Sequence, residues 1–195
     1  MKSAESSYES EVVAESAEEA AEILFETMIE FADVVLNLVK EDEKNYSSKY
    51  RKMVVKPSTK IVVITGLLKL FNSKKERLCI HYTDYVLNWK DQIVKRNDKF
   101  FLENDHIFPG APKEDIEFFR DIWRPNSTFA LTPNEKEVVF EYFDTMIDFC
   151  EQWKEFTGYT AKWENEDYDP HAEELGPEQS YLTQQYHETE KALSK

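Results

Sequence analysis

Histidine and cysteine are the side chains in this sequence best suited to chemistry, and they are scattered along it. The four histidines are His81, His106, His171 and His187, and none falls in an HExxH motif or another paired metal-ligand spacing. Cys79 and His81 are two residues apart, which points them to different faces of a helix. We therefore predict no metal site.

Asp105 and His106 form the one pair that suggests acid–base catalysis. A single Asp-His dipeptide is frequent by chance, and no nucleophile accompanies it. We interpret His106 as a capped loop residue. The prediction is that the protein is not an enzyme, has no catalytic residue and uses no cofactor.

Two other stretches resemble ligand sites only superficially. Carboxylates surround His171, but an EF-hand loop needs a glycine at its sixth position and a glutamate at its twelfth, and neither alignment works. The stretch Thr65-Gly66-Leu67-Leu68-Lys69 lacks the other glycines and the Lys-Ser/Thr ending of a phosphate-binding loop. We therefore interpret the carboxylates around His171 as part of a solvated acidic tail. Residues 65–69 do not form a nucleotide-binding loop in this interpretation.

Positive charge is concentrated in residues 44–77, between acidic ends. Ten basic residues there oppose only Glu76, a net charge of about +9, although the whole chain carries −15. We single out eight of them as a candidate binding surface: Lys49, Arg51, Lys52, Lys56, Lys60, Lys74, Lys75 and Arg77.

This basic stretch has three interpretations. It can bind nucleic acid or phosphate, with Tyr46 and Tyr50 stacking on bases as in single-strand binding proteins. It can bind an acidic protein surface, supplied by the chain's own arms, a neighbouring copy or a partner. It can also be a solvated loop without a dedicated partner. We favour the acidic protein surface, because a chain of net charge −15 repels nucleic acid at a distance.

Capping signals and apolar periodicity predict the helices. Three predicted helices begin with Ser or Thr followed three positions later by Glu, the capping box. They run from Ser16 to about Glu43, from Ser73 to near Asn97, and from Thr132 to Gly158, with a shorter helix from Lys113 to before Pro125. Between them, residues 98–112 are predicted to form an apolar loop that folds back onto the bundle.

Residues 53–65 have two readings. Ser58 can cap a helix that runs to about Asn72. Alternatively, Met53-Val54-Val55 and the β-branched run of residues 61–65 can pair as a hairpin. We favour the helix, because the sequence offers no other strands to complete a sheet.

The whole pattern predicts an all-α protein, an irregular bundle of four to five helices over residues 16–158. The 13 Phe, 10 Tyr and 4 Trp supply its core, and Cys79 and Cys150 are expected to be reduced core residues. A disordered acidic arm, residues 1–15, precedes the bundle. Residues 159–195 form an acidic tail, for which a docked helix from Glu178 toward Leu193 is the alternative.

The function predicted from these features is non-enzymatic interaction or assembly, in a larger complex such as a virion. The alternative is a nucleic-acid or phosphate-binding accessory factor that uses residues 44–77. The longest apolar run is about half the length that crosses a bilayer, and no secretory signal is visible, so we expect an intracellular location, cytoplasmic or within an assembled particle. The chain has few glycines and contains segments such as Asn97-Asp98-Lys99-Phe100-Phe101. In this composition it resembles small helical proteins of large DNA viruses. That resemblance assigns no role to any residue.

Overall fold

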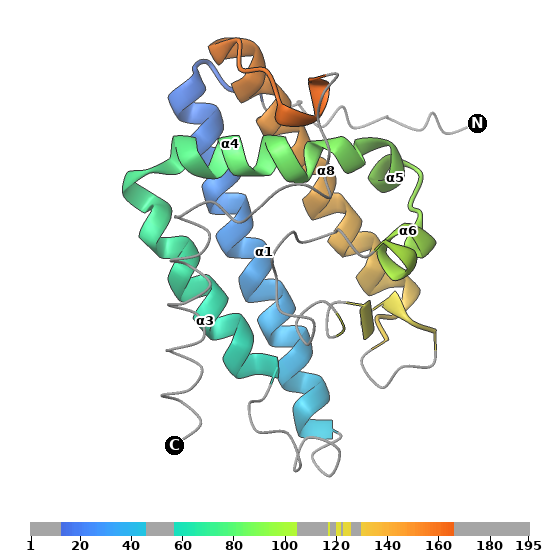
Figure 1. Ribbon diagram of the computed structural model, residues 1–195. Helices are drawn as coiled ribbons and strands as arrows, with labels where there is room; N and C mark the ends of the chain where they lie inside the picture. The colour runs from blue at the N-terminus through green and yellow to red at the C-terminus, as the bar shows by residue number, and fades with distance from the viewer. Residues whose placement is uncertain are drawn as a thin grey trace, which may run out of the picture.

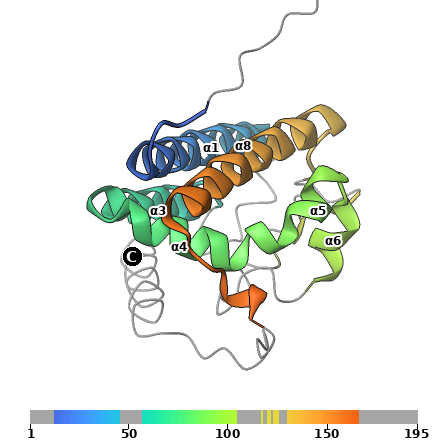
Figure 2. The ribbon, with the colours of Figure 1, turned by 90° about the horizontal axis from the view of Figure 1, so that it is seen from above.

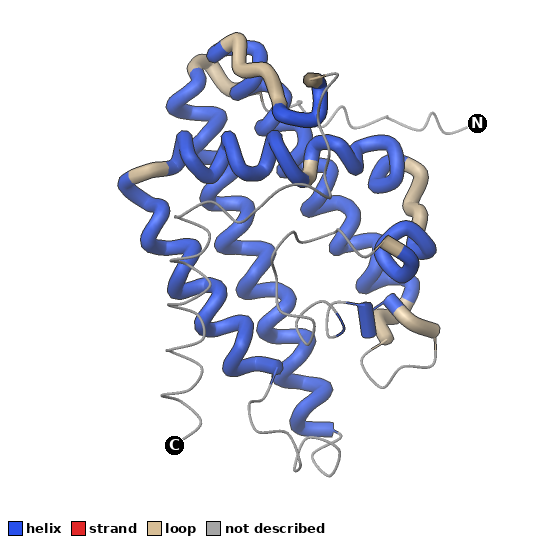
Figure 3. The backbone as a smooth tube through the Cα atoms, in the orientation of Figure 1, coloured by secondary structure: helices blue, strands red, loops and turns tan. Residues whose placement is uncertain are grey.

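The computed structural model describes residues 13–45, 57–104, 117, 120–121, 123–125 and 130–165. Every regular element in these ranges is helical, which confirms the predicted all-α bundle (Figures 1 and 3). The longer helices are α1 (Ala17–Asn45), α3 (Pro57–Leu70), α4 (Lys75–Tyr85) and α8 (Pro133–Thr157). The shorter elements are α5 (Lys90–Val94), α6 (Asp98–Glu103) and the 3-10 turns η1 (Phe71–Ser73), η2 (Leu87–Trp89) and η3 (Lys162–Glu164).

The long helix α1 is the centre of the arrangement. It packs against α8 on one side and against α3 on another (Figure 2). Helix α4 runs crosswise to α1 and α8 and contacts both of them (Figure 1). This crossing makes the bundle irregular, and α3 lies at one edge of the described helices (Figure 1).

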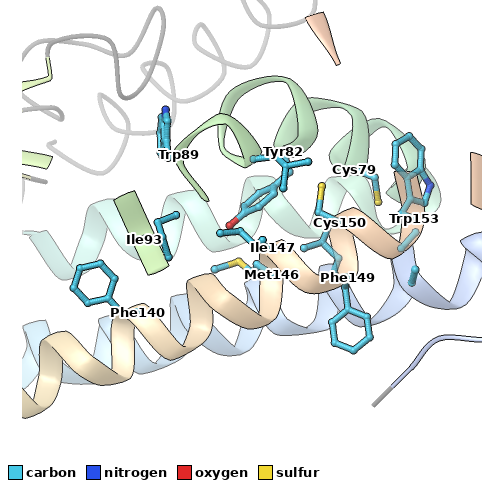
Figure 4. Close-up of a cluster of buried hydrophobic side chains, with 14 of the residues drawn as sticks. Cys79, Tyr82, Trp89, Ile93, Phe140, Met146, Ile147, Phe149, Cys150 and Trp153 are labelled. Atoms are coloured by element: carbon cyan, nitrogen blue, oxygen red, sulfur yellow. The ribbon is translucent and has the colours of Figure 1, made fainter. Parts of the chain in front are cut away.

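The core lies where α4, η2 and α5 meet α8, and it extends between α8 and α1 (Figure 4). On α8 the apolar side chains recur at helical spacing, so one face of the helix is buried along most of its length. The buried residues of α8 are Val139, Phe140, Met146, Ile147, Phe149, Cys150 and Trp153. Cys79, Tyr82, Trp89 and Ile93 pack against them from the facing elements.

An aromatic cluster fills the other end of the core. Phe101 on α6 stacks on Trp123, with ring centroids 4.7 Å apart, and neither side chain is exposed. The predicted loop is wrong over residues 98–103, which form α6, while residues 105–112 lie outside the described residues. The helical turn buries Phe101 against α8, where its ring centroid lies 6.0 Å from that of Phe140. This aromatic packing stabilises the helix.

The predicted capping signals hold at two of the helices. At the start of α8, Thr132 Oγ1 accepts a hydrogen bond from the Glu135 backbone N–H, and the Glu135 carboxylate accepts one from the Thr132 backbone N–H. Gly158 ends the helix in the left-handed conformation, with φ 67°. At α1, Ser16 Oγ accepts from the backbone N–H of Glu19 at 3.1 Å. These ends depend on neighbours in sequence, which is why the sequence predicts them.

Two predicted helix features are wrong. Ser73 does not cap α4, because it lies in the 3-10 turn before it, and Lys74 stands at the N-cap without a capping side chain. The helix expected to continue to Asn97 is interrupted by η2. The tighter turn allows Leu87 and Trp89 both to be buried, although residues two apart face different sides of an α-helix.

The choice of a helix over a hairpin is confirmed for residues 57–70, which form α3, while residues 53–56 lie outside the described residues. Ser58 does not precede this helix as its cap. Its backbone N–H and its hydroxyl both donate to the Glu43 carboxylate of α1, at 2.7 and 2.8 Å. The carboxylate thus satisfies a free N–H of the first turn and fixes α3 to α1.

The Tyr82 hydroxyl is buried between α4 and α8, and within the described part of the chain it has no hydrogen-bond partner. Burial raises the pKa of Tyr82 well above its ordinary value. We expect Tyr82→Phe to stabilise the protein by about 1 kcal/mol, because it removes an unsatisfied buried hydroxyl and keeps the ring. Urea unfolding of the two proteins measures this difference. A destabilisation of similar size would show that the hydroxyl is bonded.

Candidate docking surface

Of the side chains suited to chemistry, Cys79 of α4 and Cys150 of α8 are neighbours in the core, whereas His81 lies apart on the surface (Figure 4). Cys79 and Cys150 are free and buried, as predicted, and burial is the main cause that raises the pKa of each thiol to about 12. Cys150 Sγ lies 2.8 Å from Thr83 Oγ1, within the core. His81 is exposed on α4, with its ring 4.6 Å from that of Tyr85. Thiols of such high pKa are poor nucleophiles at neutral pH.

The remaining predicted features can be placed only in part. Asp105, His106, His171 and His187 lie outside the described residues. In the described ranges, no group of three His, Cys, Asp or Glu side chains is placed to hold a metal ion. Gly66 lies inside α3, where its backbone is helical.

Half of the predicted basic surface lies in the described ranges. Lys60 is on α3, and Lys74, Lys75 and Arg77 lie at the junction of η1 and α4; Lys49, Arg51, Lys52 and Lys56 fall outside. Lys75 forms an ion pair with Glu22 of α1 and lies 5.3 Å from the centre of the Phe25 ring. This lysine therefore stabilises the contact between α4 and α1 within the chain.

An exposed strip of Val62, Gly66, Lys69 and Leu70 runs along α3, and we call it the outer strip. Val62 is 51% exposed and Leu70 63%, and Lys69 is exposed between them. A side chain at Gly66 would meet no other atom within 4 Å. Lys74, also exposed, follows after η1. The outer strip therefore offers a partner apolar surface to cover, with lysines at one end where they remain at the polar rim of a contact.

The exposed face of α1 has the opposite charge. Glu26 and Asp33 are exposed and seven residues apart, so they lie on the same side of the helix. Glu41, which is also exposed, follows Asp33 by eight residues, about two helical turns. We call Glu26, Asp33 and Glu41 the acidic face. Exposed Lys40 and Lys44 lie on the same side near the C-terminal end of α1, so the negative charge of this helix is concentrated around Glu26 and Asp33.

A buried carboxylate that sequence reasoning missed connects the chain after Gly158 to α4. Asp84 is 3% exposed and accepts from the Tyr159 hydroxyl at 3.2 Å and from the Lys162 backbone N–H at 3.0 Å. Trp163 Nε1 donates to the Thr83 carbonyl oxygen at 2.9 Å. Residues 159–163 are thus held on α4, and the described part of the chain extends to Asn165. No local pattern signals this role, because the partners are 75 or more residues away.

None of the helices in the described ranges combines the length and apolar composition that crossing a membrane requires. The chain matches no protein-family model, no curated protein and no solved structure. We therefore infer the function from the surfaces described above.

Proposed function

We propose that this protein is a non-enzymatic interaction and assembly protein that docks through the outer strip of α3. The observation that carries the proposal is the exposure of Val62 and Leu70 beside Lys69 on one helix. Leaving large aliphatic groups in water is unfavourable, and covering them on association recovers about 25 cal/mol per Å². The fold itself does not need these side chains, because α3 packs on α1 through another face.

The partner that fits this strip is an acidic protein surface, and the acidic face of α1 in a second copy is one. Lysines at the end of an apolar strip orient an acidic partner, while the aliphatic groups supply most of the affinity. The two surfaces lie on different helices of one chain, so their contact joins one copy to the next. Such assembly would take place inside the cell or within an assembled particle.

A charge exchange tests the proposal. We expect Lys69→Glu with Lys74→Glu in one variant, and Glu26→Lys with Asp33→Lys in another, each to weaken self-association about tenfold or more, since each places like charges opposite one another. A mixture of the two variants should associate again, because the reversed surfaces complement each other. Light scattering at low and high salt measures the mass in each case.

Mutating Lys95 and Lys99, exposed lysines outside the outer strip, to Glu gives a matched control that should leave the mass unchanged. A native chain that stays monomeric at low salt would contradict the proposal. The nucleic-acid interpretation predicts a different outcome: binding of single strands that weakens steeply with salt and is lost in the lysine variant. That result, together with no self-association, would replace assembly with nucleic-acid binding.

A further inference from the structure

The two cysteines of the chain meet across the contact between α4 and α8. Cys79 and Cys150 are far apart in the sequence, yet both belong to the same core cluster and both are 0% exposed. Figure 4 shows their side chains extending toward each other from the two helices. After burial, the Cys150 thiolate is the next cause that raises the pKa of Cys79, so each sulfur lies within reach of the other's charge.

A neighbouring threonine shows how closely the two helices approach at this point. Cys150 Sγ lies 2.8 Å from Thr83 Oγ1, and each of these atoms is attached directly to a β-carbon. Thr83 follows Cys79 by four residues on α4, so the two side chains share one face of that helix. Helix α4 therefore presents Cys79 to α8 about one helical turn from a direct contact with Cys150.

Two thiols without further ligands suit a covalent bond better than a metal ion. A structural zinc site takes four ligands. In the part of the chain that the structure describes, no three His, Cys, Asp or Glu side chains are placed to hold a metal ion. His81, two residues from Cys79, is exposed on another side of α4. The pair thus has the composition of an oxidisable dithiol.

We propose that Cys79 and Cys150 form a reversible disulfide within one chain when the protein meets a peroxide. One thiolate attacks an oxygen of hydrogen peroxide, which gives a sulfenic acid and water. The second thiol then attacks the sulfenic sulfur, forms the S–S bond and releases a second water. Two electrons pass from the two sulfurs to the peroxide, and a soluble dithiol reverses the bond by exchange.

This bond fastens α4 to α8 in the core of the bundle. It closes a loop of about 70 residues that includes α5 and α6, and it thereby restricts the unfolded chain. For a loop and a chain of this length, the expected rise in Tm is about 10 °C. Burial raises the pKa of each thiol to about 12 and keeps the reaction slow, because the thiolate is the attacking form. The pair therefore adds stability under sustained oxidation and does not act as a rapid sensor.

Oxidation of the full native chain with hydrogen peroxide tests this proposal. We expect a product lighter by the mass of two hydrogen atoms, without free thiols, and a digest in which one peptide pair links residues 79 and 150. Its Tm should lie about 10 °C above that of the reduced chain, and a soluble dithiol should restore the original mass and Tm. The yield should not depend on protein concentration, because the bond lies within one chain. This distinguishes it from the association proposed above.

A thiol moved along α8 provides the matched control. Cys150→Ala with Phe156→Cys keeps two cysteines but places one where the native side chain is 50% exposed. This variant should be oxidised without a bond to Cys79. The measurements on the native chain need no substitution, so they hold even if the control variant unfolds. Oxygen added to the native cysteines in place of a bond, a disulfide that forms only in urea, a bond that leaves the Tm unchanged, or an equal yield of linkage in the control would overturn the proposal.

Discussion

Phe101→Ala should lower the free energy of unfolding by about 3–5 kcal/mol, the usual effect of removing a buried aromatic side chain. Phe101 is fully buried, stacks on Trp123 at 4.7 Å and lies 6.0 Å from the ring of Phe140. Alanine would leave a cavity between α6 and α8 that these large rings cannot fill by small movements. Urea unfolding, followed by tryptophan fluorescence, measures the loss.

Phe156→Ala is the matched control for this substitution. Phe156 is on α8 but 50% exposed, so the same truncation removes much less buried surface. We expect a loss of about 1 kcal/mol or less. Similar losses for the two variants would show that α6 does not belong to the core of the described fold.

The sequence predicts those parts of the fold that depend on neighbours in the chain. The ends of α8 follow from Thr132, Glu135 and Gly158, which act within one turn of the helix. The residues of α6 and η2 have no such local signal. Phe101 and Leu87 are placed by contacts with distant elements, so the periodicity of the sequence alone indicates a loop in one case and a continuous helix in the other.

The candidate surface was predictable in charge but not in geometry. The excess of lysine in residues 44–77 is visible in the sequence, whereas the pairing of Lys75 with Glu22 depends on how α4 crosses α1. The exposure of Val62 and Leu70 is not visible in the sequence, because residues 61–71 are apolar on several sides and the run does not show which side packs against α1. The position of α3 at the edge of the bundle decides which of its faces remain in water.

Asp84→Ala should lower the free energy of unfolding by about 2 kcal/mol, because it removes a buried acceptor that fixes two part-buried donors to α4. The carboxylate accepts from the Tyr159 hydroxyl and from the Lys162 backbone N–H, and it lies 3.9 Å from Lys162 Nζ. Burial, and then the nearby Asp84 charge, raises the pKa of Tyr159, so its hydroxyl remains a donor at neutral pH. Urea unfolding of the variant and the native chain gives the difference.

Asp91→Ala is the control, because Asp91 is on the surface of α5 and its contact with Lys95 is at 3.9 Å between two exposed side chains. Equal unfolding free energies for the two variants would contradict a structural role for Asp84. Trypsin cleavage after Lys162 separates local release from general unfolding. If Asp84 holds residues 159–164 on α4, Asp84→Ala should be cut there under conditions in which α8 stays intact. Asp84→Asn keeps an acceptor oxygen without the charge, so an intermediate cleavage rate would show that the hydrogen bonds and the charge both hold the segment.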